Sequence, residues 1–157
     1  MTIRTVLYWE DFVVGEVLEI GRHTFETEEI IAFAQQFDPQ PIHIDPVAAA
    51  DSFFEGLIAS GWHTCAIGMR FAVDAYINAG VSLGSPGVDN IRWPRPVRPG
   101  DTLTYRRMVL AARPSRSRPG AGLIQVRLEA INQNGETVMT NEGWGMFGRR
   151  PQANQTP

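Results

Sequence analysis

Apolar residues recur at helical spacing in the first half of the chain. Between Thr27 and Phe37 they lie one, two or three positions apart, and Glu28 and Glu29 fall in the first turn of the expected helix. Acidic residues stabilise a helix N-terminus, so this stretch predicts an amphipathic helix over 27–37. Asp45-Pro46 then predicts a cap and a first helical residue, followed by a short alanine-rich helix to about residue 52.

A longer helix is predicted within 55–78. Ser60 can cap this helix and Gly61 allows a close approach of the backbone, while nearly every residue from Trp62 to Ile77 is apolar. A helix that is apolar on nearly every side is enclosed by other structure. We therefore expect this helix to form the buried centre of the domain.

The second half of the chain has the composition of β-strands. β-branched and aromatic residues are concentrated in four stretches, at 88–93, 102–111, 123–132 and 136–147. Asn134-Gly135 is a strong hairpin signal between the last two, and the stretch 114–122 indicates a mobile loop. With an early strand within 17–25, the pattern predicts an α+β domain in which a curved antiparallel sheet wraps the long helix. The open edge of such a sheet favours pairing with a second copy, so we expect a homodimer or a dimer-based oligomer.

Length and composition fit one soluble domain. The chain has 157 residues, of which 43% are hydrophobic, and we assign 1–150 to a single domain and 151–157 to a disordered tail. No apolar run approaches the roughly 20 residues that span a bilayer, and the N-terminus lacks a signal-peptide core. Cys65 is the only cysteine, which excludes an internal disulfide. We expect a cytoplasmic protein that makes no membrane contact.

The charge of the chain argues against nucleic-acid binding. The formal net charge is −3, whereas general binding to nucleic acids relies on a basic surface. All 14 basic residues are arginines, and five of them lie within 106–118. Guanidinium groups bind phosphates bidentately, so this cluster indicates either a phosphorylated small-molecule partner or a solvated loop. The three histidines are scattered and have no recognisable ligand spacing, so we expect no metal site.

The stretch 37–45, Phe-Asp-Pro-Gln-Pro-Ile-His-Ile-Asp, is the most distinctive motif. Its two prolines push the residues before them, Asp38 and Gln40, toward extended conformations, which predicts a stiff loop. Such a loop can direct the Asp38 carboxylate and the His43 imidazole at one water molecule. A purely structural pair is the alternative, but Asp38 follows a helix instead of starting one, so N-capping does not explain it.

Several segments in order resemble the MaoC-like acyl dehydratases, relatives of the R-specific enoyl-CoA hydratases. These are 33–45 with the Asp-His motif, 56–63 (Gly-Leu-Ile-Ala-Ser-Gly-Trp-His), 91–93 (Ile-Arg-Trp) and 96–103 (Pro-Val-Arg-Pro-Gly-Asp-Thr-Leu). The similarity extends over about residues 10 to 148. It implies a hotdog fold, in agreement with a sheet that wraps one helix. It also implies a hydro-lyase that reversibly hydrates a trans-2-enoyl-CoA to an (R)-3-hydroxyacyl-CoA.

The resemblance further implies residue roles. Asp38 and His43 would hold the catalytic water, and the backbone N–H of Gly61 would bind the thioester oxygen. Five further residues are candidates for substrate binding: Gln40, Ser60, Trp62, His63 and Arg92. The implied substrate is an acyl-CoA or acyl-carrier thioester that enters at a dimer boundary with arginines near its phosphates. No cofactor is expected besides the coenzyme A of the substrate, and acyl length and branching stay open.

Two other functions stay open. A thioesterase of the same fold usually carries an acid on the central helix, where only Asp74 is available here. A non-catalytic acyl-CoA binder is the other alternative, because the motif departs from the family pattern. Phe37 and Gln40 replace a common glycine and asparagine, and Met69 stands near a position where some relatives have a small polar residue that orients the Asp-His pair.

Overall fold

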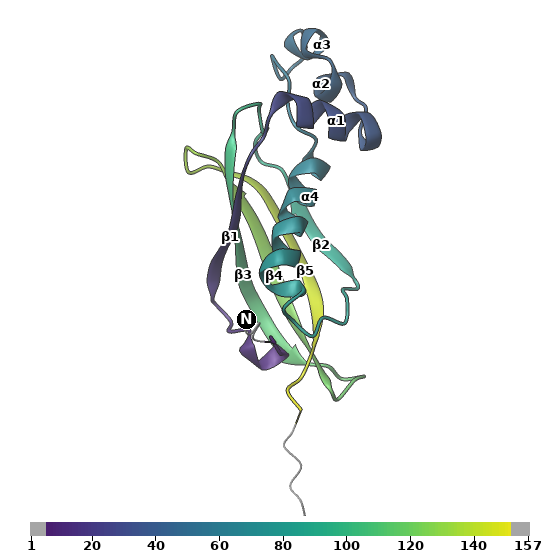
Figure 1. Cartoon of the computed structure of the whole chain (residues 1–157), viewed down its shortest axis with the longest axis vertical. Coiled ribbons are helices and arrows are strands. Elements are labelled where there is room, and N and C mark those ends of the chain that lie inside the picture. Colours follow the sequence, from purple (N-terminus) through teal and green to yellow (C-terminus); the bar gives the residue numbers. More distant parts are fainter. Residues whose placement is uncertain (1–5, 152–157) are drawn as a thin grey trace, which may run out of the picture.

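The structure is a computed structural model that describes residues 6–151. Its strands form one five-stranded antiparallel sheet in the order β1-β3-β4-β5-β2. The strands are β1 (Val17–Thr24), β2 (Gly87–Arg92), β3 (Thr102–Pro114), β4 (Ala121–Ile131) and β5 (Thr137–Gly148). The sheet curves around one long helix, as Figure 1 shows.

That central helix is α4 (Gly61–Ala72), which continues into the π-helical turn η2 (Val73–Ile77). Three shorter helices gather at one end of the sheet, beyond the N-terminus of α4 (Figure 1): α1 (Thr27–Phe37), α2 (Pro41–Ile44) and α3 (Pro46–Ala50). A short 3-10 turn, η1 (Trp9–Asp11), lies near the opposite end. Within residues 6–151, no helix is long and apolar enough to cross a membrane.

The main core lies between α4 and the sheet. Buried side chains from β1–α1, β3 and β5 form one cluster here, including Phe25, Ile30, Leu103, Tyr105 and Met139. Tyr105 is fully buried, and its hydroxyl donates a hydrogen bond of 3.0 Å to the backbone oxygen of Thr64 in α4. This contact fixes the first turns of the helix to the sheet.

The α+β hotdog architecture predicted from the sequence is confirmed. Helix α1 has the predicted bounds, and the carboxylate of Asp45 caps α3 by accepting from the backbone N–H groups of Val47 and Ala48 at 2.9 and 3.1 Å. The hairpin at Asn134-Gly135 joins β4 to β5, with Gly135 at a φ of 78° that glycine adopts readily. Strands β3 and β4 extend into the predicted 114–122 loop and leave only 115–120 outside the strands.

Two expectations were wrong. The stretch 37–45 is not a stiff loop throughout, because Pro41–Ile44 forms the short helix α2; proline is tolerated in a first helical turn, where an N–H would have no partner. Within the single chain, the central helix is also not enclosed on nearly every side, since Trp62, Ala66 and Met69 of α4 are exposed. The predicted disordered tail, 151–157, lies outside the described residues except for Pro151.

The contact of Tyr105 with α4 yields a stability prediction. Replacing Tyr105 by Phe removes the hydrogen bond to Thr64 while keeping the buried ring, so we expect the free energy of unfolding to fall by about 1 kcal/mol. Tyr76→Phe is the matched control, because Tyr76 is also buried and its hydroxyl has no hydrogen-bond partner within residues 6–151. Denaturant unfolding of both variants measures the difference, and equal losses would contradict the assignment.

Candidate functional site

The end of α1 and the short helix α2 place an acid and an imidazole side by side. Asp38 is the C-cap of α1, where its backbone N–H donates to the oxygen of Ala34 at 2.8 Å. Gln40 is extended, with φ −75° and ψ 143°, as the proline after it predicts. Helix α2 then turns the chain so that the buried side chain of His43 faces back toward Asp38.

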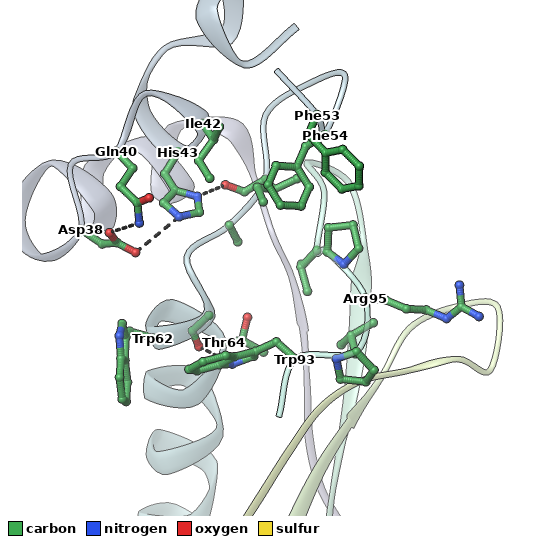
Figure 2. Close-up of a pocket in the computed structure, with 17 residues that line it drawn as sticks. Asp38, Gln40, Ile42, His43, Phe53, Phe54, Trp62, Thr64, Trp93 and Arg95 are labelled. Carbon is green, nitrogen blue, oxygen red and sulfur yellow. Dashed lines mark hydrogen bonds and ion pairs between the residues drawn. The ribbon is translucent and has the colours of Figure 1, made fainter. Parts of the chain in front are cut away.

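The orientation of His43 is set by a backbone carbonyl. Its Nδ1 lies 2.8 Å from the oxygen of Ile58, and because a carbonyl oxygen only accepts, Nδ1 must carry the proton. The other ring nitrogen, Nε2, lies 3.4 Å from Oδ2 of Asp38. In the neutral imidazole Nε2 is therefore an acceptor aimed at the carboxylate, as Figure 2 shows.

The carboxylate of Asp38 is held by two donors. Gln40 Nε2 donates to Oδ1 at 2.7 Å, and Ser60 Oγ donates to Oδ2 at 2.7 Å. Burial alone would raise the pKa of Asp38, but the hydrogen bonds from Gln40 and Ser60 and the nearby His43 outweigh it, so this pKa lies below its usual value. Asp38 is ionised at neutral pH. Asp38 Oδ2 and His43 Nε2 are then two acceptors that face each other, an arrangement suited to a water molecule that donates one hydrogen to each.

The first residue of α4 contributes a free backbone donor. Gly61 follows the N-cap Ser60, and its N–H is one of the amides that a helix N-terminus leaves without an intrahelical partner. It has no protein acceptor within residues 6–151. The indole of Trp93 packs directly on Gly61 and donates from Nε1 to its backbone oxygen at 3.1 Å. A side chain at position 61 would place a Cβ 2.5 Å from Trp93 Cε2, so this packing requires glycine.

These groups share one cavity of about 500 Å³. Asp38, Gln40, His43 and Gly61 line it together with apolar and aromatic residues: Ile42, Phe53, Phe54, Ile58, Ala59, Trp62, Trp93, Pro94, Pro96, Val97 and Val138. Thr64 and Arg95 also line the cavity, and Figure 2 shows the Arg95 guanidinium on the side away from Asp38. The cavity thus combines an apolar wall with a small polar group at one end, as small-molecule sites commonly do.

Three of the five residues predicted to bind substrate do not line this cavity: Arg92, His63 and Ser60. Arg92 ends β2 as an exposed side chain that donates to the backbone oxygen of Ile91 at 3.0 Å. His63 is buried on the other side of α4, stacked on Phe33 at 4.5 Å between ring centroids. Burial lowers the pKa of His63, although Glu29 at 3.9 Å opposes this effect. His63 therefore packs α4 against α1.

Ser60 also lies outside the cavity lining, but its hydroxyl contacts Asp38. Of the five predicted substrate-binding residues, only Gln40 and Trp62 line the cavity.

Several cavity residues were not identified from the sequence. Phe53 is 93% exposed and lies beside Phe54, with ring centroids 5.4 Å apart, in the turn that follows α3. Trp93 and Arg95 come from the proline-containing segment after β2. The available signal was the two segments that carry the family resemblance, 91–93 and 96–103. Trp93 lies in the first segment, and Arg95 lies between the two, three residues from Arg92.

Three residues that supported other functions, Asp74, Met69 and Phe37, do not line the cavity of the Asp-His pair. Asp74 is in η2 and accepts from Arg70 Nε at 2.8 Å. Met69 lines a separate cavity of about 310 Å³ between α4 and the sheet. Phe37 is 68% exposed and packs on Phe33. In the part of the chain that the structure describes, no group of three or more His, Cys, Asp and Glu side chains could hold a metal ion.

Comparison of the sequence and the structure with known proteins identifies a family for this chain. The family model described as a MaoC like domain matches residues 12–130. The crystal structure of a MaoC-like dehydratase from Rhodospirillum rubrum is 43% identical in sequence and has a TM-score of 0.84, covering 92% of this chain and 99% of that chain.

Two protein sequences are also similar. The uncharacterized protein YdeM of Bacillus subtilis is 29% identical over 133 residues, which are 85% of this chain and 93% of YdeM. The mesaconyl-CoA hydratase of Cereibacter sphaeroides is 35% identical over 85 residues, which are 54% of this chain and 23% of that protein.

The contact between Gly61 and Trp93 yields a second prediction. In Gly61→Ala the new methyl group would overlap the indole, so we expect a loss of about 1–3 kcal/mol in the free energy of unfolding. In a Trp93→Ala background the overlap is absent, and the same substitution should cost much less. Gly120→Ala is the control, because a Cβ there meets no atom within 4 Å. Equal costs of Gly61→Ala in the two backgrounds, measured by denaturant unfolding, would contradict this account.

Proposed function

This chain belongs to the MaoC-like domain family, and from that membership and the geometry of its cavity we propose that it is a hydro-lyase acting on an acyl thioester. The proposed reaction is the reversible addition of water to a trans-2-enoyl thioester, which gives a 3-hydroxyacyl thioester. Asp38 and His43 act on the water, and the N–H of Gly61 acts on the thioester carbonyl.

One observation carries the proposal. Asp38 Oδ2 and His43 Nε2, which are both acceptors when the imidazole is neutral, lie 3.4 Å apart in a cavity that Gly61 also lines, and the N–H of Gly61 has no protein acceptor within residues 6–151. Hydration of an enoyl thioester needs an activated water at the β-carbon and a donor for the charge that develops on the carbonyl oxygen. In the proposed reaction the Asp-His pair would activate the water and the Gly61 amide would be the donor.

The first step forms the bond between the water oxygen and the β-carbon. The water donates one hydrogen to Asp38 Oδ2 and the other to His43 Nε2, and His43 accepts the proton as the oxygen adds. The resulting imidazolium is stabilised by the adjacent carboxylate, because Asp38 stays ionised. The bond from Nδ1 to Ile58 holds the ring in place while its charge changes.

The electron pair displaced from the double bond moves to the thioester oxygen. The N–H of Gly61 stabilises this oxygen by a hydrogen bond and by the positive end of the α4 dipole. Loss of one such donor typically costs about 3–4 kcal/mol of transition-state stabilisation. His43 then returns its proton to the α-carbon, so the net change is addition of one water, and dehydration follows the reverse path.

The apolar wall of the cavity and the name of one relative support a coenzyme A thioester as the substrate. The wall formed by Ile42, Phe54, Trp62 and Trp93 suits an apolar acyl or pantetheine chain. A relative that is 35% identical over 85 residues is named mesaconyl-CoA hydratase, an enzyme whose name specifies a CoA thioester. The resemblance to R-specific hydratases supports an (R)-3-hydroxyacyl product.

The proposed enzyme is a homodimer. Strand β2 pairs with β5 on one side only, so its other edge presents unpaired backbone groups within the described chain. Exposed apolar side chains lie along the same side of the molecule, on α4 and around β2: Trp62, Met69, Val88 and Trp93. A second copy that pairs through β2 would cover both features.

Replacing Asp38 by Asn tests the catalytic proposal. Asn keeps the size of the side chain but removes the negative charge that accepts from the water and stabilises the imidazolium. We expect the rate of enoyl-CoA hydration, followed as loss of the conjugated enoyl absorbance, to fall by roughly 10²- to 10⁴-fold with the fold retained.

Asp51→Asn is the control for this variant, because Asp51 is an exposed carboxylate at the end of α3. Near-normal turnover by Asp38→Asn would refute the role of Asp38. Release of free thiol from acyl-CoA, monitored with a thiol reagent, would indicate a thioesterase, and tight acyl-CoA binding without turnover by the wild type would indicate a binding protein.

The dimer is tested at Val88, which is 54% exposed on β2. Val88→Glu places a charge in the proposed contact, so we expect dissociation at concentrations where the wild type is a dimer, measured by sedimentation equilibrium. Val47→Glu introduces the same change at a 76% exposed position of α3 and should leave the dimer intact. A wild-type protein that sediments as a monomer at every concentration would exclude the dimer.

A further inference from the structure

Ser60 joins the two halves of the candidate site. It is fully buried, and its hydroxyl donates to Asp38 Oδ2 at 2.7 Å while accepting from the backbone N–H of Trp62 at 3.3 Å. The second contact is the N-cap of α4, whose next residue is Gly61. One hydroxyl therefore connects the carboxylate that faces His43 with the helix turn that presents the Gly61 amide.

The Ser60 hydroxyl contacts the same Asp38 oxygen that we propose binds the water. Oδ2 of Asp38 is the atom that lies 3.4 Å from His43 Nε2. Ser60 occupies one acceptor direction of Oδ2, and Gln40 holds Oδ1 at 2.7 Å, so the carboxylate is prevented from rotating about its terminal bond. The remaining acceptor direction of Oδ2 is then available to a water.

We propose that Ser60 is a positioning residue, which fixes the Asp38 carboxylate relative to the Gly61 amide and does not contact the substrate. This assignment rests on the proposed hydratase function, and it replaces the substrate-binding role expected from the sequence. Ser60 does not line the cavity. In some relatives, a small polar residue near the position of Met69 orients the Asp-His pair. Met69 does not contribute to this site, because it lines the separate cavity.

The groups around Asp38 determine whether its pKa rises or falls when the Ser60 hydroxyl is removed. Burial raises the pKa of Asp38, whereas the hydrogen bonds from Gln40 and Ser60, and His43 when it is protonated, lower this pKa, with a net lowering. Removing the Ser60 hydroxyl takes away one lowering contribution and leaves the burial in place. The pKa of Asp38 should therefore rise, and protonation of Asp38 should begin at a higher pH.

Three variants separate this role from helix capping. Ser60→Ala removes the contact with Asp38 and also the cap, whereas Ser60→Gly removes the contact but costs only a few tenths of a kcal/mol as a cap. Ser60→Thr keeps a hydroxyl. Ser115→Ala is the control, because that half-buried serine lies in the loop between β3 and β4, at the end of the sheet remote from α1–α3.

Two measurements follow on each variant. Carboxyl ¹³C NMR titration gives the pKa of Asp38, whose signal is identified by its absence in Asp38→Asn. Steady-state hydration of an enoyl-CoA gives kcat and KM. We expect Ser60→Gly and Ser60→Ala to raise the pKa of Asp38 and to lower kcat by up to about 10²-fold with KM little changed, and Ser60→Thr to recover most of kcat.

An unchanged pKa of Asp38 in Ser60→Gly would overturn the proposal, as would a rise in KM with kcat retained, which indicates direct substrate binding. The titration needs no substrate. If the wild type hydrates no enoyl thioester, the proposed function fails, while the titration still reports whether Ser60 controls Asp38.

Discussion

The hydrogen bond from His43 Nδ1 to the carbonyl oxygen of Ile58 is the contact on which the candidate site depends. An unconstrained imidazole can present either nitrogen as the acceptor, but this 2.8 Å bond leaves only Nε2 free for that role. A backbone hydrogen bond joins the same two segments, since the N–H of Ile58 donates to the oxygen of Ile42 at 3.2 Å. Helix α2 is thereby attached to the segment that leads into α4. The imidazole and the Gly61 amide thus belong to one connected backbone unit.

The rest of the fold holds that unit against the sheet. Ala59 donates its N–H to the oxygen of Val97 at 2.8 Å, which ties the segment before α4 to the segment before β3. Tyr105 fixes the first turns of α4 from β3, and Trp93 packs on Gly61 from the end of β2. Because these contacts come from separate segments of the chain, the N-terminus of α4 is held in place on several sides. A preorganised donor of this kind needs no rearrangement when charge develops on a bound carbonyl.

The elements that the sequence predicted well are those with local signals. Helix α1 follows from apolar spacing, the α3 cap from Asp45-Pro46, and the last hairpin from Asn134-Gly135. Helix α2 was missed because four residues are too short to show periodicity. His63 was misplaced for a geometric reason, since two residues along a helix rotate a side chain by about 200°, away from the face of Gly61. The bond between Ser60 and Asp38 joins residues 22 positions apart, and no local pattern encodes such a contact.

The positions of residues along the central helix also favour a hydratase, which adds water to a double bond, over a thioesterase, which hydrolyses the thioester. An acid on the central helix could assist hydrolysis only near the thioester carbonyl, which in the proposed binding mode would lie at the Gly61 amide. Asp74 lies 13 residues further along, a rise of about 20 Å, and its carboxylate accepts from Arg70. The carboxylate and the imidazole that line the cavity with Gly61 are those of Asp38 and His43, which come from outside α4. The Asp-His pair in this cavity therefore approaches from α1 and α2, and in the proposed reaction it would act on a carbon beyond the carbonyl while the helix amide polarises the acyl group.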